Sequence, residues 1–201
     1  MLCVACRDEL PRIRPPICER CGAPTAWPVA RCRECTGRRL AFTCARAAVT
    51  YEDQVRRLVA AWKERGLRRV AREAAAIVAE SLPRPDADAL VFVPGDGARR
   101  LERGHQPAEH LARELATVWE LPCASLLTRR GRSRRQRGLS LPERRRNVRG
   151  AFSAARAHGR LVLVDDVYTS GATADAAAVA LRAAGAEAVA VVTFARAVRR
   201  V

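Results

Sequence analysis

One stretch of the sequence decides the expected fold, and it reads Leu161-Val162-Leu163-Val164-Asp165-Asp166-Val167-Tyr168-Thr169-Ser170-Gly171-Ala172-Thr173. Its first four residues are apolar and predict a buried strand. The run Thr-Ser-Gly-Ala-Thr predicts a loop that enters a helix, where backbone N–H groups and hydroxyls surround the positive end of the helix. Gly171 allows a sharp turn in that loop. The stretch therefore predicts a phosphate site at the carboxyl end of a strand.

The two adjacent acids, Asp165 and Asp166, strengthen this interpretation. Carboxylates at the end of a buried strand are costly unless they meet a cation or hydroxyl donors, so we expect them to hold a ligand. The simpler alternative is an ordinary helix cap, in which Thr169 or Ser170 binds free N–H groups and the acids are solvated. The chain contains neither G-x-x-x-x-G-K-[ST] nor G-x-G-x-x-G, which argues against a P-loop or a dinucleotide site.

Strands and helices are expected to alternate through most of the chain. Short apolar runs predict strands, and apolar residues at helical spacing predict helices, with Gly66 interrupting the first helical region. This alternation predicts an α/β fold, a doubly wound parallel sheet over residues 46–201 whose ligands bind at the carboxyl ends of the strands. The strands are expected at residues 48–51, 88–93, 124–127, 161–164 and 188–194, and the helices at 55–78, 108–118 and 173–184.

The first 45 residues have a different character and are expected to form a small Cys-rich module. Seven of the eight cysteines lie within residues 1–44. The spacings Cys18-x-x-Cys21 and Cys32-x-x-Cys35 are typical of structural zinc ligands, so we predict a zinc ribbon built on these four thiolates. Disulfides would require an oxidising compartment, which nothing in the sequence indicates. A third pair, Cys3-x-x-Cys6, is left over, because three pairs do not fill a whole number of four-cysteine sites.

Length and composition narrow the class of protein. The 201 residues suffice for one α/β domain and a small appendage. No run of about 18 apolar residues occurs, which argues against a membrane span, and no signal peptide is recognisable, so we expect a cytoplasmic protein. The net charge of +16 suits polyphosphate or nucleic-acid partners. Lys63 is the only lysine among 37 lysines and arginines, which also fits a compositional bias toward arginine. The oligomeric state stays open.

Residues 161–173 resemble the signature of the type I phosphoribosyltransferases, which bind 5-phosphoribosyl-1-pyrophosphate (PRPP). The matching features are four apolar residues, two acids and a Thr/Ser-Gly-x-Thr loop. The resemblance implies that Asp165 and Asp166 hold the ribose 2′- and 3′-hydroxyls and serve as the catalytic acids. It also implies that the 5′-phosphate is held by Thr169, Ser170, Gly171, Ala172 and Thr173.

Further motifs resemble the ComF family of competence and gluconate-associated proteins, and the match covers nearly the whole chain. The family resemblance implies that Arg99, Arg100 and Arg103 face the pyrophosphate, that Gln136 and Arg144 lie in a mobile loop over the ligand, and that Mg²⁺ accompanies PRPP. The chain departs from the family at His105-Gln106-Pro107, where Phe-Asn-Gln is usual. Besides the cysteines, the motifs are Val93-Pro94, Arg99-Arg100-Leu101-Glu102-Arg103-Gly104, Gln136, Leu139-Ser140, Arg144 and Asn147-Val148-Arg149-Gly150-Ala151-Phe152.

These observations support two hypotheses for function. The first is an enzyme, a phosphoribosyltransferase that displaces pyrophosphate from PRPP with an unknown nitrogen acceptor, in the setting of competence and DNA uptake. The second is a nonenzymatic DNA-uptake factor or PRPP sensor that uses the same fold. In the second, the zinc module and the arginine-rich residues 129–149, which contain ten arginines, would contact single-stranded DNA or a competence helicase.

Overall fold

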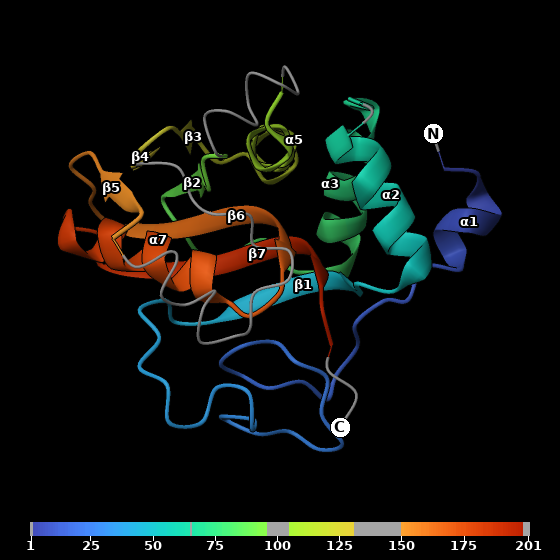
Figure 1. The fold of residues 1–201 in the computed structure, drawn as a ribbon, viewed down its shortest axis with the longest axis horizontal. Helices are drawn as coiled ribbons and strands as arrows, with labels where there is room; N and C mark the ends of the chain where they lie inside the picture. Colours follow the sequence, from blue (N-terminus) through green and yellow to red (C-terminus); the bar gives the residue numbers. More distant parts are fainter. Residues whose placement is uncertain (1, 65, 96–104, 131–149, 199–201) are drawn as a thin grey trace.

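A computed structural model describes residues 2–64, 66–95, 105–130 and 150–198 of the chain. Its centre is a five-stranded parallel sheet in the order β1-β7-β6-β2-β3 (Figure 1). The strands of this sheet are β1 (Ala45–Thr50), β2 (Ala89–Phe92), β3 (Cys123–Ala124), β6 (Arg160–Tyr168) and β7 (Ala188–Arg196). The helices are α1 (Val4–Asp8), α2 (Asp53–Glu64), α3 (Arg69–Ser81), α5 (Pro107–Trp119) and α7 (Ala172–Ala183).

Two apolar clusters bury the two faces of the sheet. One cluster joins α2, α3 and α5 to the side chains of Val162 and Val164 in β6. The other joins α7 and the Cys-rich segment to Leu161 and Leu163 in the same strand (Figure 1). Successive residues of a strand point to opposite faces, so this alternation is what a strand covered on both sides requires. The predicted doubly wound parallel α/β fold is therefore confirmed.

The central strand β6 is longer than the sequence predicts. The apolar run ends at Val164, but the strand continues to Tyr168 and carries both acids within it. The reason is its neighbour β7, which extends to Arg196 and pairs with β6 as far as Tyr168 opposite Arg196. Backbone hydrogen bonds therefore continue the strand where hydrophobicity no longer indicates it.

The strand predicted at residues 124–127 is wrong as a single element. Two short strands replace it, separated by two residues. The first, β3, extends the sheet beside β2, and the second, β4 (Leu127–Arg129), pairs antiparallel with β5 (Phe152–Ala154). The other predicted strands and helices agree with the structure to within a few residues, and the helical region breaks after Glu64, next to Gly66, as expected.

The Cys-rich segment lies directly against the sheet (Figure 1). Gly22 marks the closest approach, because a Cβ placed there would lie 2.4 Å from the carbonyl oxygen of Ala45 in β1. Gly22 also has φ +70, a conformation that favours glycine. The division of the chain into residues 1–45 and 46–201 as separate folding units stays a prediction. Within the described ranges, no helix combines the length and apolarity needed to cross a bilayer.

We predict that Gly22→Ala destabilises the protein far more than Gly37→Ala. Gly37 has nearly the same backbone conformation, φ +73, but nothing lies within 4 Å of its added Cβ. The control should therefore lose only about 1 kcal/mol of unfolding free energy for the strained backbone. Gly22→Ala adds a clash with the β1 backbone and should lose about 3 kcal/mol or more. Denaturant unfolding measures both, and equal losses would contradict the close packing at Gly22.

Candidate functional site

The loop after β6 forms one wall of a small hollow at the carboxyl end of this central strand. The hollow is lined by Asp165, Val167, Tyr168, Thr169, Gly171, Thr173, Ala174 and Thr193. Helix α7 begins at Ala172, directly after Gly171, whose φ of 71 is left-handed. A Cβ on Gly171 would lie 2.2 Å from the Tyr168 hydroxyl, so only glycine fits above that ring. The structure therefore brings the predicted phosphate loop and Asp165 to one hollow at a helix N-terminus.

The chain topology places a switch point of the sheet beside β6, the strand whose carboxyl end borders the hollow. From β2 the chain proceeds through α5 to β3 on one side, whereas from β6 it proceeds through α7 to β7 on the other. Because β2 and β6 are neighbours, their two connections leave in opposite directions and open a crevice at the carboxyl ends of both strands. Open α/β sheets bind their ligands in such crevices.

The two neighbouring acids have different surroundings. Asp165 lines the hollow and accepts a hydrogen bond from the backbone N–H of Asp166, at 2.9 Å. Asp166 is buried and accepts a hydrogen bond from Lys63 Nζ at 2.6 Å, in an ion pair that reaches across from the last turn of α2. The sequence analysis assigned no role to Lys63. The sequence nevertheless sets Lys63 apart, because it is the only lysine of a chain that otherwise uses arginine.

Burial and charge set the protonation of these groups. Burial, together with the neighbouring Asp166 charge, raises the pKa of Asp165 to about 7, and the Lys63 ammonium only partly opposes this. Burial is the largest single influence on Lys63 and would lower its pKa, but the charge and hydrogen bond of Asp166 together with the charge of Asp165 raise that pKa. Lys63 is therefore a cation paired with Asp166, and Asp165 changes its charge near neutral pH.

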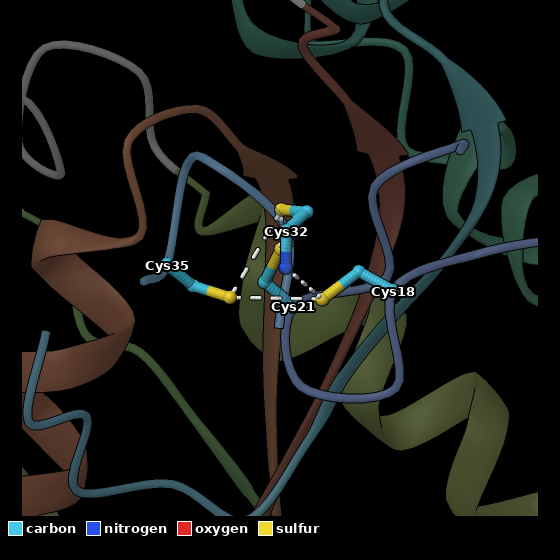
Figure 2. Close-up of side chains that lie close together, drawn as sticks. All are labelled: Cys18, Cys21, Cys32 and Cys35. Atoms are coloured by element: carbon cyan, nitrogen blue, oxygen red, sulfur yellow. Dashed lines mark hydrogen bonds between the residues drawn. The ribbon is translucent and has the colours of Figure 1, made fainter. Parts of the chain in front are cut away.

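Four thiols of the Cys-rich segment form a second candidate site. The sulfurs of Cys18, Cys21, Cys32 and Cys35 all lie within 4.8 Å of one another (Figure 2). The closest pairs are 3.4 Å for Cys21 with Cys32 and 3.6 Å for Cys18 with Cys35. Four sulfurs at about 2.3 Å from a tetrahedral zinc lie about 3.8 Å apart, so this donor set fits a metal ion such as zinc.

The backbone around the four thiols also suits a metal site. The N–H of Cys32 donates to the sulfur of Cys18 at 3.2 Å. Burial opposes ionisation of Cys18, but such N–H donors outweigh it and lower the pKa of its thiol to about 7. Thiolates are the form that binds metal. Among the described residues, Cys3 and Cys6 are free thiols outside this cluster.

The remaining predicted residues lie outside the described ranges. These are Arg99, Arg100, Arg103, Gln136 and Arg144, so the structure says nothing of their placement. The structure does describe residues 105–106, where the sequence departs from the family pattern. His105 is buried with its Nε2 2.8 Å from the carbonyl oxygen of Trp62, and the Gln106 Oε1 accepts a hydrogen bond from the Gly95 N–H at 3.0 Å. Gln106 thus ties the two ends of residues 95–106 together.

Comparison with known proteins finds a similar sequence along nearly the whole chain. Competence protein F of Haemophilus influenzae is 28% identical over 213 residues, which cover 98% of this chain and 90% of that protein. No family model matches the chain.

Two solved structures are similar in part. The glutamine PRPP amidotransferase from B. subtilis, complexed with ADP and GMP, has a TM-score of 0.45 and 25% identity over 63% of this chain. This chain spans 26% of that amidotransferase. The orotate phosphoribosyltransferase from Aeropyrum pernix has a TM-score of 0.37 and 23% identity over 73% of this chain and 67% of its own.

The sequence match and the structure point the same way. The resemblance to Competence protein F extends over nearly the whole chain, through both the Cys-rich segment and the α/β sheet. The four cysteines predicted to form a zinc ribbon lie together in the structure. The resemblance of this chain to the ComF family, with a parallel α/β domain behind an N-terminal four-cysteine cluster, is therefore confirmed.

Proposed function

We propose that this chain binds PRPP with Mg²⁺ in the crevice between β2 and β6 and acts as a phosphoribosyltransferase of the ComF type. The observation that carries the proposal is the hollow in which Asp165 and the loop Thr169–Thr173 meet at a helix N-terminus. A ribose 5-phosphate needs hydroxyl acceptors on one side and N–H donors on the other, and this hollow offers both. The reaction would displace pyrophosphate from the anomeric carbon by a nitrogen acceptor.

Each residue of the site has a role in this proposal. Asp165 and Asp166 accept hydrogen bonds from the ribose hydroxyls, and the backbone of Thr169–Thr173 holds the 5′-phosphate. Lys63 donates to Asp166 and holds its carboxylate in place. The oxygen donors that line the hollow suit Mg²⁺, which when bound neutralises charge on the departing pyrophosphate. On the family resemblance, Arg99, Arg100, Arg103, Gln136 and Arg144 would bind that pyrophosphate.

A second candidate function is a nonenzymatic PRPP-binding factor in DNA uptake. Similarity to a protein named for competence and the net charge of +16 favour this alternative. Its partner would be single-stranded DNA or a competence helicase. Pyrophosphate release from PRPP and Mg²⁺ in the presence of candidate nucleobases separates the two functions, because only the enzyme releases it.

We predict that PRPP with Mg²⁺ binds the wild-type chain and that Asp165→Asn weakens this binding about ten- to a hundredfold. A charge-assisted hydrogen bond contributes about 1.5 to 3 kcal/mol, and the amide replaces a carboxylate acceptor by a weaker one. Isothermal titration calorimetry measures the affinities. Asp53→Asn is the matched control, since this aspartate is exposed, pairs with Arg56 on α2 and does not line the hollow. Wild-type protein that ignores millimolar PRPP would overturn the proposed function.

We also predict that Asp165 makes stability and ligand affinity change in opposite directions with pH. The pKa of Asp165 is raised to about 7 in the folded state, above its ordinary value of 3.8. The protonated folded form is therefore favoured, and stability falls as pH rises from about 4 to 7, by at most about 1.4 kcal/mol per pH unit. Asp165→Asn should lack this slope in denaturant unfolding.

Ligand binding should have the opposite slope, because the ribose hydroxyls donate to the ionised carboxylate. Affinity for ribose 5-phosphate should increase up to about tenfold per pH unit until pH 7 and then level off. The Asp165→Asn variant supplies the reference, since it retains only the titration of the ligand itself. Identical pH profiles for the two proteins would exclude Asp165 as the titrating acceptor.

For the metal, we predict one zinc per chain on Cys18, Cys21, Cys32 and Cys35. Cys18→Ser should abolish stoichiometric zinc and lower the melting temperature, because structural zinc contributes about 10 kcal/mol or more to binding-coupled folding. Cys3→Ser is the control, as Cys3 is exposed and outside the cluster, and it should retain the metal. Elemental analysis measures the content. Two zincs per chain would show that Cys3 and Cys6 bind metal as well.

A further inference from the structure

Arg196 is a fully buried cation between the four cysteines and the phosphate loop. It ends β7 and is 1% exposed. Its guanidinium donates to the carbonyl oxygen of Cys21 at 2.5 Å, to the carboxylate of Glu34 at 2.7 Å and to the sulfur of Cys21 at 3.5 Å. A buried charge requires such partners, and all three acceptors belong to the Cys-rich segment. The position of Arg196 therefore depends on that segment.

The same guanidinium touches the residue that supports the phosphate loop. Its Cζ lies 4.5 Å from the centre of the Tyr168 ring, in a cation–π contact, and the edge of Phe42 packs on that ring with centroids 6.3 Å apart. Tyr168 is the last residue of β6, and its hydroxyl lies directly against Gly171. Contacts thus continue without a break from Cys21 through Arg196 and Tyr168 to the glycine of the loop.

A second connection reaches the loop from Arg38, three residues after Cys35. Arg38 Nη1 donates to the carbonyl oxygen of Ser170 at 3.0 Å. The C=O and N–H of a trans peptide point in opposite directions, so holding the Ser170 carbonyl also fixes the direction of the Gly171 N–H. That N–H is one of the donors expected to meet the phosphate. Nearby, the Ala41 N–H donates to Asp175 in the first turn of α7, at 2.8 Å.

We propose that Arg38 and Arg196 are positioning residues that couple the four-cysteine cluster to the phosphate loop, so that a phosphate ester binds tightly only when the cluster holds metal. The inference rests on the proposed function and deepens it by adding a control of the same site. Without metal, Cys21 and Glu34 lose the geometry that surrounds Arg196, and the backbone after Cys35 no longer fixes Arg38. The loop then loses both supports. Coupling between sites is reciprocal, so the ligand must also retain the metal.

The experiment uses ribose 5-phosphate as the probe and the zinc-loaded full chain as the protein. Calorimetry measures the affinity for ribose 5-phosphate. Equilibrium competition with a chromogenic chelator measures the protection of zinc, which is the factor by which ribose 5-phosphate tightens zinc binding. We expect ribose 5-phosphate to tighten zinc binding by wild-type protein about tenfold, within the usual range of coupling between sites. Arg38→Ala should bind ribose 5-phosphate more weakly, and at saturating ligand its protection of zinc should fall below about twofold.

Arg39→Ala is the matched control, because its side chain is exposed and makes no hydrogen bond within the described ranges. It should behave like wild type in both measurements. Glu34→Gln tests the Arg196 connection without removing the buried guanidinium itself, since Glu34 is partly exposed and would keep its shape. This variant should also reduce the protection of zinc by ribose 5-phosphate.

The possible outcomes separate this proposal from the function on which it rests. If zinc-loaded wild type does not bind ribose 5-phosphate, the proposed function fails and the coupling fails with it. If it binds but the affinity for zinc is the same with and without ligand, only the coupling is overturned. Protection in Arg38→Ala and Glu34→Gln equal to that of wild type would likewise overturn the assignment of these connections.

Discussion

The parallel pairing of β6 with β7 continues beyond the apolar part of β6, and the site depends on that extension. Hydrogen bonds carry both strands as far as Tyr168 and Arg196. The extension holds Asp165 and Asp166 rigidly at the end of a central strand instead of in a loop. It also places Tyr168 beside Arg196, directly under the glycine where α7 begins. The candidate site and its support therefore arise from one feature of the backbone.

The cost of burying two adjacent carboxylates explains the position of Lys63. One unpaired buried carboxylate costs several kcal/mol, and two neighbouring ones also repel each other. An ammonium 2.6 Å from Asp166 offsets that cost for one acid and leaves the other to titrate near neutral pH. Lysine supplies this charge as a compact ammonium on a flexible stem, which here meets a single carboxylate oxygen, Asp166 Oδ1. Lys63 thus differs from the many arginines both in residue type and in its pairing with one of two adjacent acids.

The sequence predicts the elements whose signal is local and misses the pairings between distant residues. The apolar run 161–164, the helical spacing on both sides of Gly66 and the two cysteine pairs are local patterns, and the structure contains all of them. The extension of β6 depends on β7, the Lys63–Asp166 ion pair joins residues 103 apart, and Arg196 meets Cys21 across 175 residues. No window of sequence contains both partners of such a contact. Of these three contacts, only the Lys63–Asp166 pair has a local sign in the sequence, the single lysine.

The Cys-rich segment takes part in both the core and the site. Cys18, Cys21, Cys35 and Phe42 share one apolar cluster with α7 and the inner residues of β6. A small segment with little core of its own needs a metal to fold. Here the folded segment also completes the cover of one sheet face. It supplies the groups that accept hydrogen bonds from Arg196 and the Arg38 guanidinium that donates to the Ser170 carbonyl oxygen. On the proposed coupling, loss of the cluster would therefore expose apolar surface on the sheet and release the loop after β6 together, because one segment performs both tasks.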